Sequence, residues 1–245
     1  MQRLRTSVGE IQTYVLEPEG RCAASVLLVH GWAGEAAFMA AFADYMCRRK
    51  IRSVLLDLPA HGQSAGHRTN LMDCAQAVRE AAQAMGPVQF AIAHSIGGLA
   101  VLLAGEGRHP MRGRHPFEAY VLLAMPDRFA DVTRRFGDEQ ALSPGGLRAF
   151  ERRLERLAQR RIADFTGSNL LAATDRPTLV LHSRDDQEVP FQDAERLKAS
   201  APSVELQAID GFGHCMLLYA PPVVRAAAAF LQRFQRRSHG MRSSR

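Results

Sequence analysis

The sequence contains little cysteine and no long apolar run. Its 245 residues include four cysteines, none of them in a Cys-x-x-Cys pair: Cys22, Cys47, Cys74 and Cys215. A disulfide framework or a structural zinc site is therefore not expected, and a reducing compartment fits. No apolar segment approaches the roughly 18–20 residues of a membrane span, and residues 1–10 lack the apolar core of a signal peptide. We therefore expect a cytoplasmic protein without stable membrane insertion.

Lysine is also scarce, so arginine supplies nearly all of the positive charge. The formal net charge is +6, but five arginines and no acidic residue fall between residues 233 and 245, and the rest of the chain carries only +1. We interpret residues 235–245 as a basic, flexible tail, and we predict no nucleic-acid partner. The composition, 47% hydrophobic and 23% charged, is that of a globular domain and excludes a disordered chain.

Short apolar segments alternate with longer amphipathic ones along most of the chain. The short segments lack polar alternation, which is typical of strands buried on both faces of a parallel sheet. They are residues 25–30, 52–58, 88–94, 119–125, 178–182 and 204–209. Helical patterns separate them, so we expect an α/β fold with helices on both faces of the sheet. Residues 4–16 alternate more and contain Gly9, which predicts an antiparallel entry hairpin.

The segment between the fourth of these strands and residue 177 shows no strand pattern. Leu147, Phe150, Leu154 and Leu157 recur there at helical spacing among many charges. We interpret residues 127–176 as a helical cap inserted after the fourth parallel strand. The core is then one discontinuous domain, residues 1–126 and 177–234.

Three serines fit a loose [Gly/Ala]-x-Ser-x-Gly pattern, in which small neighbours allow a tight strand-to-helix turn. They are Ser64, Ser95 and Ser143. Ser64 is followed by a polar loop, and Ser143 is preceded by charged residues and followed by proline. Only Ser95 connects an apolar strand directly to an apolar helix. This context predicts Ser95 as a nucleophile.

A serine nucleophile needs a base and an acid that orients the base. His214 lies in a Gly-Phe-Gly-His loop after the last strand, where it can reach the carboxyl edge of the sheet. Asp186 follows the fifth strand and is the predicted acid, with the adjacent Asp185 fixing the turn. Asp127, after the fourth strand, is the alternative acid. We interpret His182, at the end of the fifth strand, as structural.

An oxyanion site needs two backbone N–H donors that point at one position. The Ile96 N–H, at the start of the helix after Ser95, is one candidate. The loop after the first parallel strand reads His30-Gly31-Trp32-Ala-Gly34, and its glycines allow the backbone to turn toward the site. The Trp32 N–H is the second candidate donor.

These motifs, in this order, resemble those of the α/β-hydrolase superfamily. The resemblance covers residues 25–220 and is closest to the esterase, lysophospholipase and serine-aminopeptidase-like branch. It implies an α/β-hydrolase fold with a mostly parallel twisted sheet, and it implies that the glycine-rich loop containing Ser64 is a connection near the site entrance. Two positions depart from the usual pattern, because Ala60 and Ala93 stand where glycine is commoner.

The expected function is a carboxylesterase that hydrolyses a small-molecule ester through an acyl-enzyme, with no cofactor and no metal. A thioesterase, a lysophospholipase or an aminopeptidase-like amidase could use the same triad, although none of Glu35, Glu139 and Glu151 stands out as the anchor for a substrate amine. A non-catalytic small-molecule receptor on the same fold would be a function of another class. A peripheral membrane lipase, with an arginine-rich cap that meets anionic lipid, is a third alternative. The sequence predicts no oligomeric state. The candidate pocket residues are His30, Gly31, His94, Phe129, Phe150 and Met216.

Overall fold

The computed structural model describes residues 1–240, which fold around an eight-stranded sheet of order β1-β2-β4-β3-β5-β6-β7-β8. The strands are β1 (Gln2–Thr6), β2 (Gly9–Leu16), β3 (Ala24–Val29), β4 (Ile51–Leu56), β5 (Phe90–His94), β6 (Ala119–Leu123), β7 (Thr178–Ser183) and β8 (Val204–Ile209). The pairs β1–β2 and β2–β4 are antiparallel, and all the other pairs are parallel. The predicted α/β fold with an antiparallel entry hairpin is therefore confirmed.

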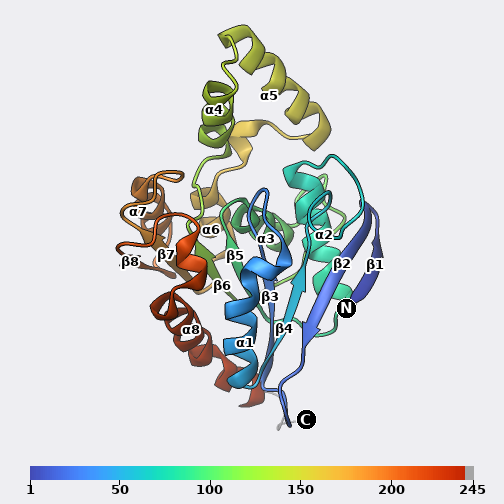
Figure 1. Ribbon diagram of the computed structural model, residues 1–245, viewed down its shortest axis with the longest axis vertical. Helices are drawn as coiled ribbons and strands as arrows, with labels where there is room; N and C mark the ends of the chain where they lie inside the picture. Colours follow the sequence, from blue (N-terminus) through green and yellow to red (C-terminus); the bar gives the residue numbers. More distant parts are fainter. Residues whose placement is uncertain (241–245) are drawn as a thin grey trace.

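Helices cover both faces of this sheet, as Figure 1 shows. One face carries α1 (Ala40–Arg48) and α8 (Pro221–Gly240), and the other carries α2 (Leu71–Ala84), α3 (Ile96–Glu106) and α7 (Phe191–Ala199). Successive residues of β3 serve the two cores in turn, since Val26 packs with the first group of helices and Leu27 with the second. Burial on both faces is why these strands read as unbroken apolar runs.

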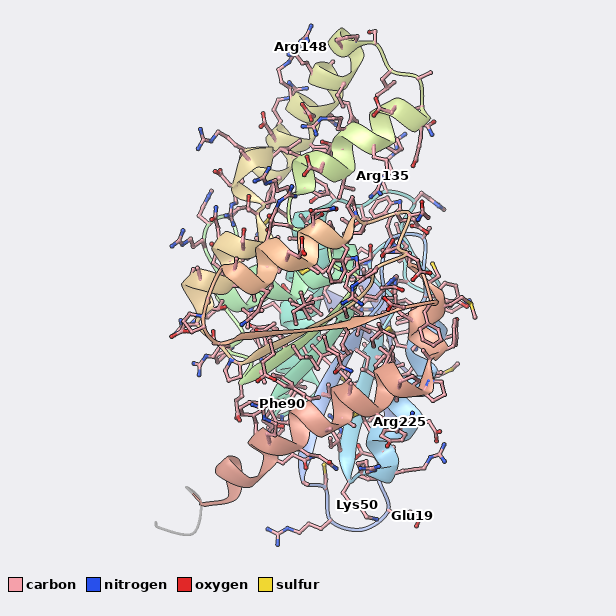
Figure 2. The ribbon with its side chains drawn as sticks, turned by 90° about the vertical axis from the view of Figure 1, so that its left-hand side faces the viewer. Glu19, Lys50, Phe90, Arg135, Arg148 and Arg225 are labelled. Atoms are coloured by element: carbon pink, nitrogen blue, oxygen red, sulfur yellow. The ribbon has the colours of Figure 1, made fainter. Side chains whose placement is uncertain are left out.

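The segment between β6 and β7 contains α4 (Phe129–Glu139), α5 (Pro144–Ala158), the short helix η2 (Ile162–Asp164) and α6 (Gly167–Thr174). Figure 1 shows α4 and α5 standing above the sheet. In Figure 2, Arg148 of α5 lies at the opposite end of the molecule from Lys50. In contrast, α6 packs into the core, where Leu170 and Leu171 are buried.

The two ends of this projecting segment are joined where it leaves the core. The Phe129 N–H donates to the Phe165 carbonyl at 3.1 Å, and the Gly167 N–H donates to the Asp127 carbonyl at 2.6 Å. Arg128 and Thr166 form a bridge between them. The helices α4 and α5 therefore leave and return at one point, and the part that projects is shorter than residues 127–176.

The last helix, α8, continues through residues 235–240, into the segment that the sequence analysis set apart as a tail. Residues 241–245 lie outside the described residues. None of the helices in residues 1–240 is both long enough and apolar enough to cross a membrane.

Candidate active site

Ser95 occupies the turn between β5 and α3 in a conformation that few non-glycine residues adopt. Its φ is 51° and its ψ is −128°, which is a strained region of the kind that clusters at functional sites. Its N–H donates to the Leu123 carbonyl on the neighbouring strand at 2.8 Å. The turn therefore holds Ser95 at the carboxyl edge of the sheet.

The two glycines after Ser95 allow α3 to pack closely. A Cβ at Gly97 would lie 2.4 Å from the His30 carbonyl oxygen, and one at Gly98 would lie 2.6 Å from the Met125 sulfur. No larger residue fits at either place without displacing backbone or core. The sequence Ser-Ile-Gly-Gly therefore reflects how close the helix start must come to β3 and β6.

The other two serines of the loose pattern take part in local structure. The Ser64 hydroxyl donates to the Asp57 carbonyl at 2.7 Å and accepts the Gln12 N–H at 2.8 Å. The Ser143 hydroxyl caps the start of α5 by accepting the Gly146 N–H at 3.1 Å. Both hydroxyls stabilise loops or helix ends.

Asp186 and His214 are brought together from loops 28 residues apart. Asp186 Oδ2 lies 2.8 Å from His214 Nδ1, and both side chains are buried. The other oxygen, Oδ1, accepts the N–H groups of Glu188 and Val189, each at 2.8 Å. Burial alone would raise the pKa of Asp186, but the hydrogen bonds from His182, His214 and Val189 outweigh it and lower this pKa.

His182 is a neighbour of Asp186 that the sequence did not reveal. It is fully buried, and its Nε2 lies 2.9 Å from the Val189 carbonyl and 3.3 Å from Asp186 Oδ2. A histidine four residues before an acid in a strand-end loop could have signalled this contact. His182 thus holds both the acid and the loop that carries it.

The two other acidic candidates form different contacts. Asp185 accepts hydrogen bonds from the Ser183 hydroxyl and the Gly211 N–H, so it ties two loops together. Asp127 accepts the Ser168 N–H at 2.8 Å at the base of the projecting helices. Neither carboxylate is hydrogen-bonded to His214.

His94, the residue before Ser95 in the chain, contacts His214. The ring centroids of His94 and His214 are 4.6 Å apart, and His94 Nε2 lies 3.0 Å from the His214 carbonyl oxygen. Within residues 1–240, Ser95 Oγ and His214 Nε2 are not hydrogen-bonded to each other. Glu188 Oε2 lies 3.8 Å from His214 Nε2. In enzymes without bound substrate, catalytic hydrogen bonds are often long and shorten when substrate binds.

His30 sets the direction of the loop that contains Trp32. The Leu58 N–H donates to His30 Nε2 at 3.0 Å, so the ring proton is on Nδ1, which donates to the Gly31 carbonyl at 2.7 Å. The Gly31 carbonyl and the Trp32 N–H belong to one planar peptide and point in opposite directions. His30 therefore fixes the direction of the Trp32 N–H. A Cβ at Gly31 would be 3.0 Å from Ser95 Cβ, so this loop passes directly over the serine.

The remaining pocket candidates differ in position. Phe129 is half-buried and packs edge-on against Phe165, and Phe150 packs against Phe136 within the projecting pair. Met216 is 60% exposed on η3 (Met216–Tyr219), directly after the His214 loop. A polar cavity of about 490 Å³ lies elsewhere, at the far end of α3 from Ser95, and includes Glu106 and Arg160.

Because His30 and His94 are buried, we expect the free energy of unfolding to decrease in mild acid. Burial lowers the pKa of His30 to about 4 and that of His94 to about 3, against about 6.5 in the unfolded chain. The unfolded state therefore binds more protons than the folded state below pH 6.5. The free energy of unfolding decreases as the pH is lowered, until the pH reaches the pKa of each histidine in the folded state. Each histidine should lower the free energy of unfolding by roughly 2 kcal/mol when the pH is lowered from 7 to 5. Urea unfolding at these two pH values measures the loss, and equal midpoints would contradict the prediction.

Comparisons with known proteins identify the family and the fold. The model of the alpha/beta hydrolase family matches residues 26–227. A search of curated proteins found no match. Among solved structures, Est1E from Butyrivibrio proteoclasticus with bound ferulic acid is similar, with a TM-score of 0.74 and 16% identity over 95% of this chain and 98% of that one.

Two further solved structures are similar to this chain. A thermophilic esterase from Thermogutta terrifontis has a TM-score of 0.69 and 18% identity, covering 95% of this chain and 99% of its own. The Pyrococcus furiosus esterase Pf2001 has a TM-score of 0.71 and 18% identity, covering 95% of this chain and 91% of its own. At such low identity, these three structures show a shared fold.

Proposed function

We propose that this chain, which belongs to the alpha/beta hydrolase family, hydrolyses carboxylic esters of small molecules. Ser95 is the nucleophile. The observation that carries this proposal is the hydrogen bond between Asp186 and His214, together with a strained turn after β5 that holds Ser95. His214 also contacts His94, the residue before Ser95. Two of the similar structures named above, those from Thermogutta terrifontis and Pyrococcus furiosus, are esterases, and this supports an ester as the substrate.

The proposed reaction forms and breaks an acyl-enzyme. His214 Nε2 takes the proton of the Ser95 hydroxyl as Oγ attacks the ester carbonyl, and Asp186 holds the proton on Nδ1. The N–H groups of Trp32 and Ile96 stabilise the oxyanion. The imidazolium then gives its proton to the departing alkoxide. A water molecule, deprotonated by His214, releases the acid and restores Ser95.

The buried histidines around the triad have supporting roles in this scheme. His94 positions the backbone of His214, since its ring nitrogen is bound to the His214 carbonyl. His30 orients the Trp32 N–H through the Gly31 carbonyl. We propose that neither imidazole exchanges protons with the substrate. A thioester or amide would be cleaved by the same steps with a different leaving group.

A fluorophosphonate probe tests the proposed nucleophile. We expect one covalent adduct per chain, located on Ser95 by peptide mass spectrometry, because the phosphorus mimics an attacked acyl carbon. The Ser95→Ala variant should carry no adduct under the same conditions. A folded wild-type chain that remains unlabelled would instead favour a non-catalytic small-molecule receptor of the same fold.

A further inference from the structure

A second carboxylate lies beside the catalytic nitrogen of His214. Glu188 Oε2 is 3.8 Å from His214 Nε2, while Asp186 occupies the opposite nitrogen, Nδ1. The Glu188 side chain is 62% exposed. The proposed reaction uses Asp186 and leaves Glu188 without a role.

The position of Glu188 is tied to the triad through its backbone. Its N–H donates to Asp186 Oδ1 at 2.8 Å, and the Val189 N–H donates to the same oxygen. The Val189 carbonyl in turn is bound by the buried His182 at 2.9 Å. The carboxylate that orients His214 therefore also anchors the residue that places a second negative charge near Nε2.

This placement puts the Glu188 carboxylate close to any bound substrate. Nε2 must come within about 3 Å of the leaving-group atom that it protonates. Since Glu188 Oε2 is 3.8 Å from Nε2, it must lie within about 7 Å of that atom. A charge a few bonds from the scissile carbonyl lies within the range of this carboxylate.

Little positive charge offsets Glu188 in its surroundings. Within residues 1–235, whose side chains the structure describes, the ion pairs of Glu188 include His214 and no arginine or lysine. Burial lowers the pKa of His94 to about 3 and that of His30 to about 4, so both are neutral at pH 7. Arg184, four residues before Glu188 in the chain, is paired with Asp210 at 3.0 Å. The Glu188 carboxylate therefore puts a negative charge beside Nε2 that no arginine or lysine ion pair offsets.

We propose that Glu188 is a specificity-determining residue, which favours esters with a positive charge a few bonds from the scissile carbonyl and disfavours negatively charged ones. This inference rests on the proposed function. For an exposed carboxylate at this distance, we expect a preference of about 3- to 10-fold in kcat/KM, decreasing with added salt. The cation can belong to the leaving group or to the acyl group.

Two sets of isosteric esters test the preference and locate the cation. Acetylcholine, neutral 3,3-dimethylbutyl acetate and anionic 2-sulfonatoethyl acetate vary the leaving group. The p-nitrophenyl esters of β-alanine and butyric acid vary the acyl group. For each charged ester, kcat/KM is divided by kcat/KM of the neutral ester in the same set. This ratio is compared among the wild type, Glu188→Gln and the matched control Glu195→Gln, which changes an exposed carboxylate on α7.

We expect the wild type and Glu195→Gln to prefer the cationic esters over the neutral ones and to hydrolyse the anionic ester less well. In Glu188→Gln, the cationic-to-neutral and anionic-to-neutral ratios should each move 3- to 10-fold toward one. The arm with the larger change identifies the side that carries the cation. Unchanged ratios in both arms of Glu188→Gln would overturn the inference while Ser95-dependent hydrolysis of the neutral esters still supports the proposed function. Hydrolysis that persists in Ser95→Ala would overturn the proposed function itself.

Discussion

The Ser95→Ala variant should lose at least about 10⁴-fold in kcat for a short p-nitrophenyl ester, because no other group in the proposed site can form the acyl-enzyme. The fold should survive, since alanine removes one oxygen and keeps the Cβ that the turn already accommodates at a φ of 51°. Circular dichroism and the unfolding midpoint of the variant would establish this. Turnover at saturating ester measures the loss.

Ser64→Ala is the matched control, because Ser64 satisfies the same short motif. Its hydroxyl bridges the Asp57 carbonyl and the Gln12 N–H, so its loss should lower stability by about 1 kcal/mol and leave kcat within a few-fold. If Ser64→Ala abolished turnover and Ser95→Ala did not, the nucleophile would be misassigned.

The Asp186→Asn variant should lower kcat about 10³- to 10⁴-fold. Asp186 accepts hydrogen bonds at both oxygens, from His182 and His214 on one side and from two backbone N–H groups on the other. An amide accepts on one side only. If its NH₂ faces His214, the ring proton moves to Nε2 and the base is lost. If it faces the backbone, two N–H groups lose their acceptor.

Asp185→Asn provides the comparison for this variant, since it makes the same change one residue earlier. Asp185 joins the Ser183 and Gly211 loops without contacting His214, so we expect a loss of less than about tenfold. The kcat values at pH 7, with unfolding midpoints for both variants, decide the matter. A larger loss in Asp185→Asn, or in Asp127→Asn, would move the acid to that residue.

The elements that carry the site were predictable because they depend on local sequence. Strands β3 and β5 are buried on both faces, and so their apolar runs identified them without any neighbour. Ser95 differed from Ser64 and Ser143 by the strand before it and the helix after it, which are both local properties.

The surroundings of the triad were not predictable in the same way. His182 has the residue type and position of a buried strand-end histidine, and its spacing of four residues from Asp186 is a weak signal that does not by itself place it 3.3 Å from Asp186 Oδ2. Glu188 likewise reads as a surface residue of a turn. The extent of the cap was also uncertain, because α6 follows the projecting helices directly and packs with the core.

The sequence by itself determined that this chain builds a mostly parallel, doubly covered sheet with a serine in the turn after β5. Burial and turn geometry leave marks within a few residues of where they act. Only the tertiary structure decided which carboxylates reach His214, because those contacts join residues 28 and 26 positions apart through loops whose paths depend on the whole sheet edge. That edge places Asp186 on one nitrogen of the ring and Glu188 beside the other.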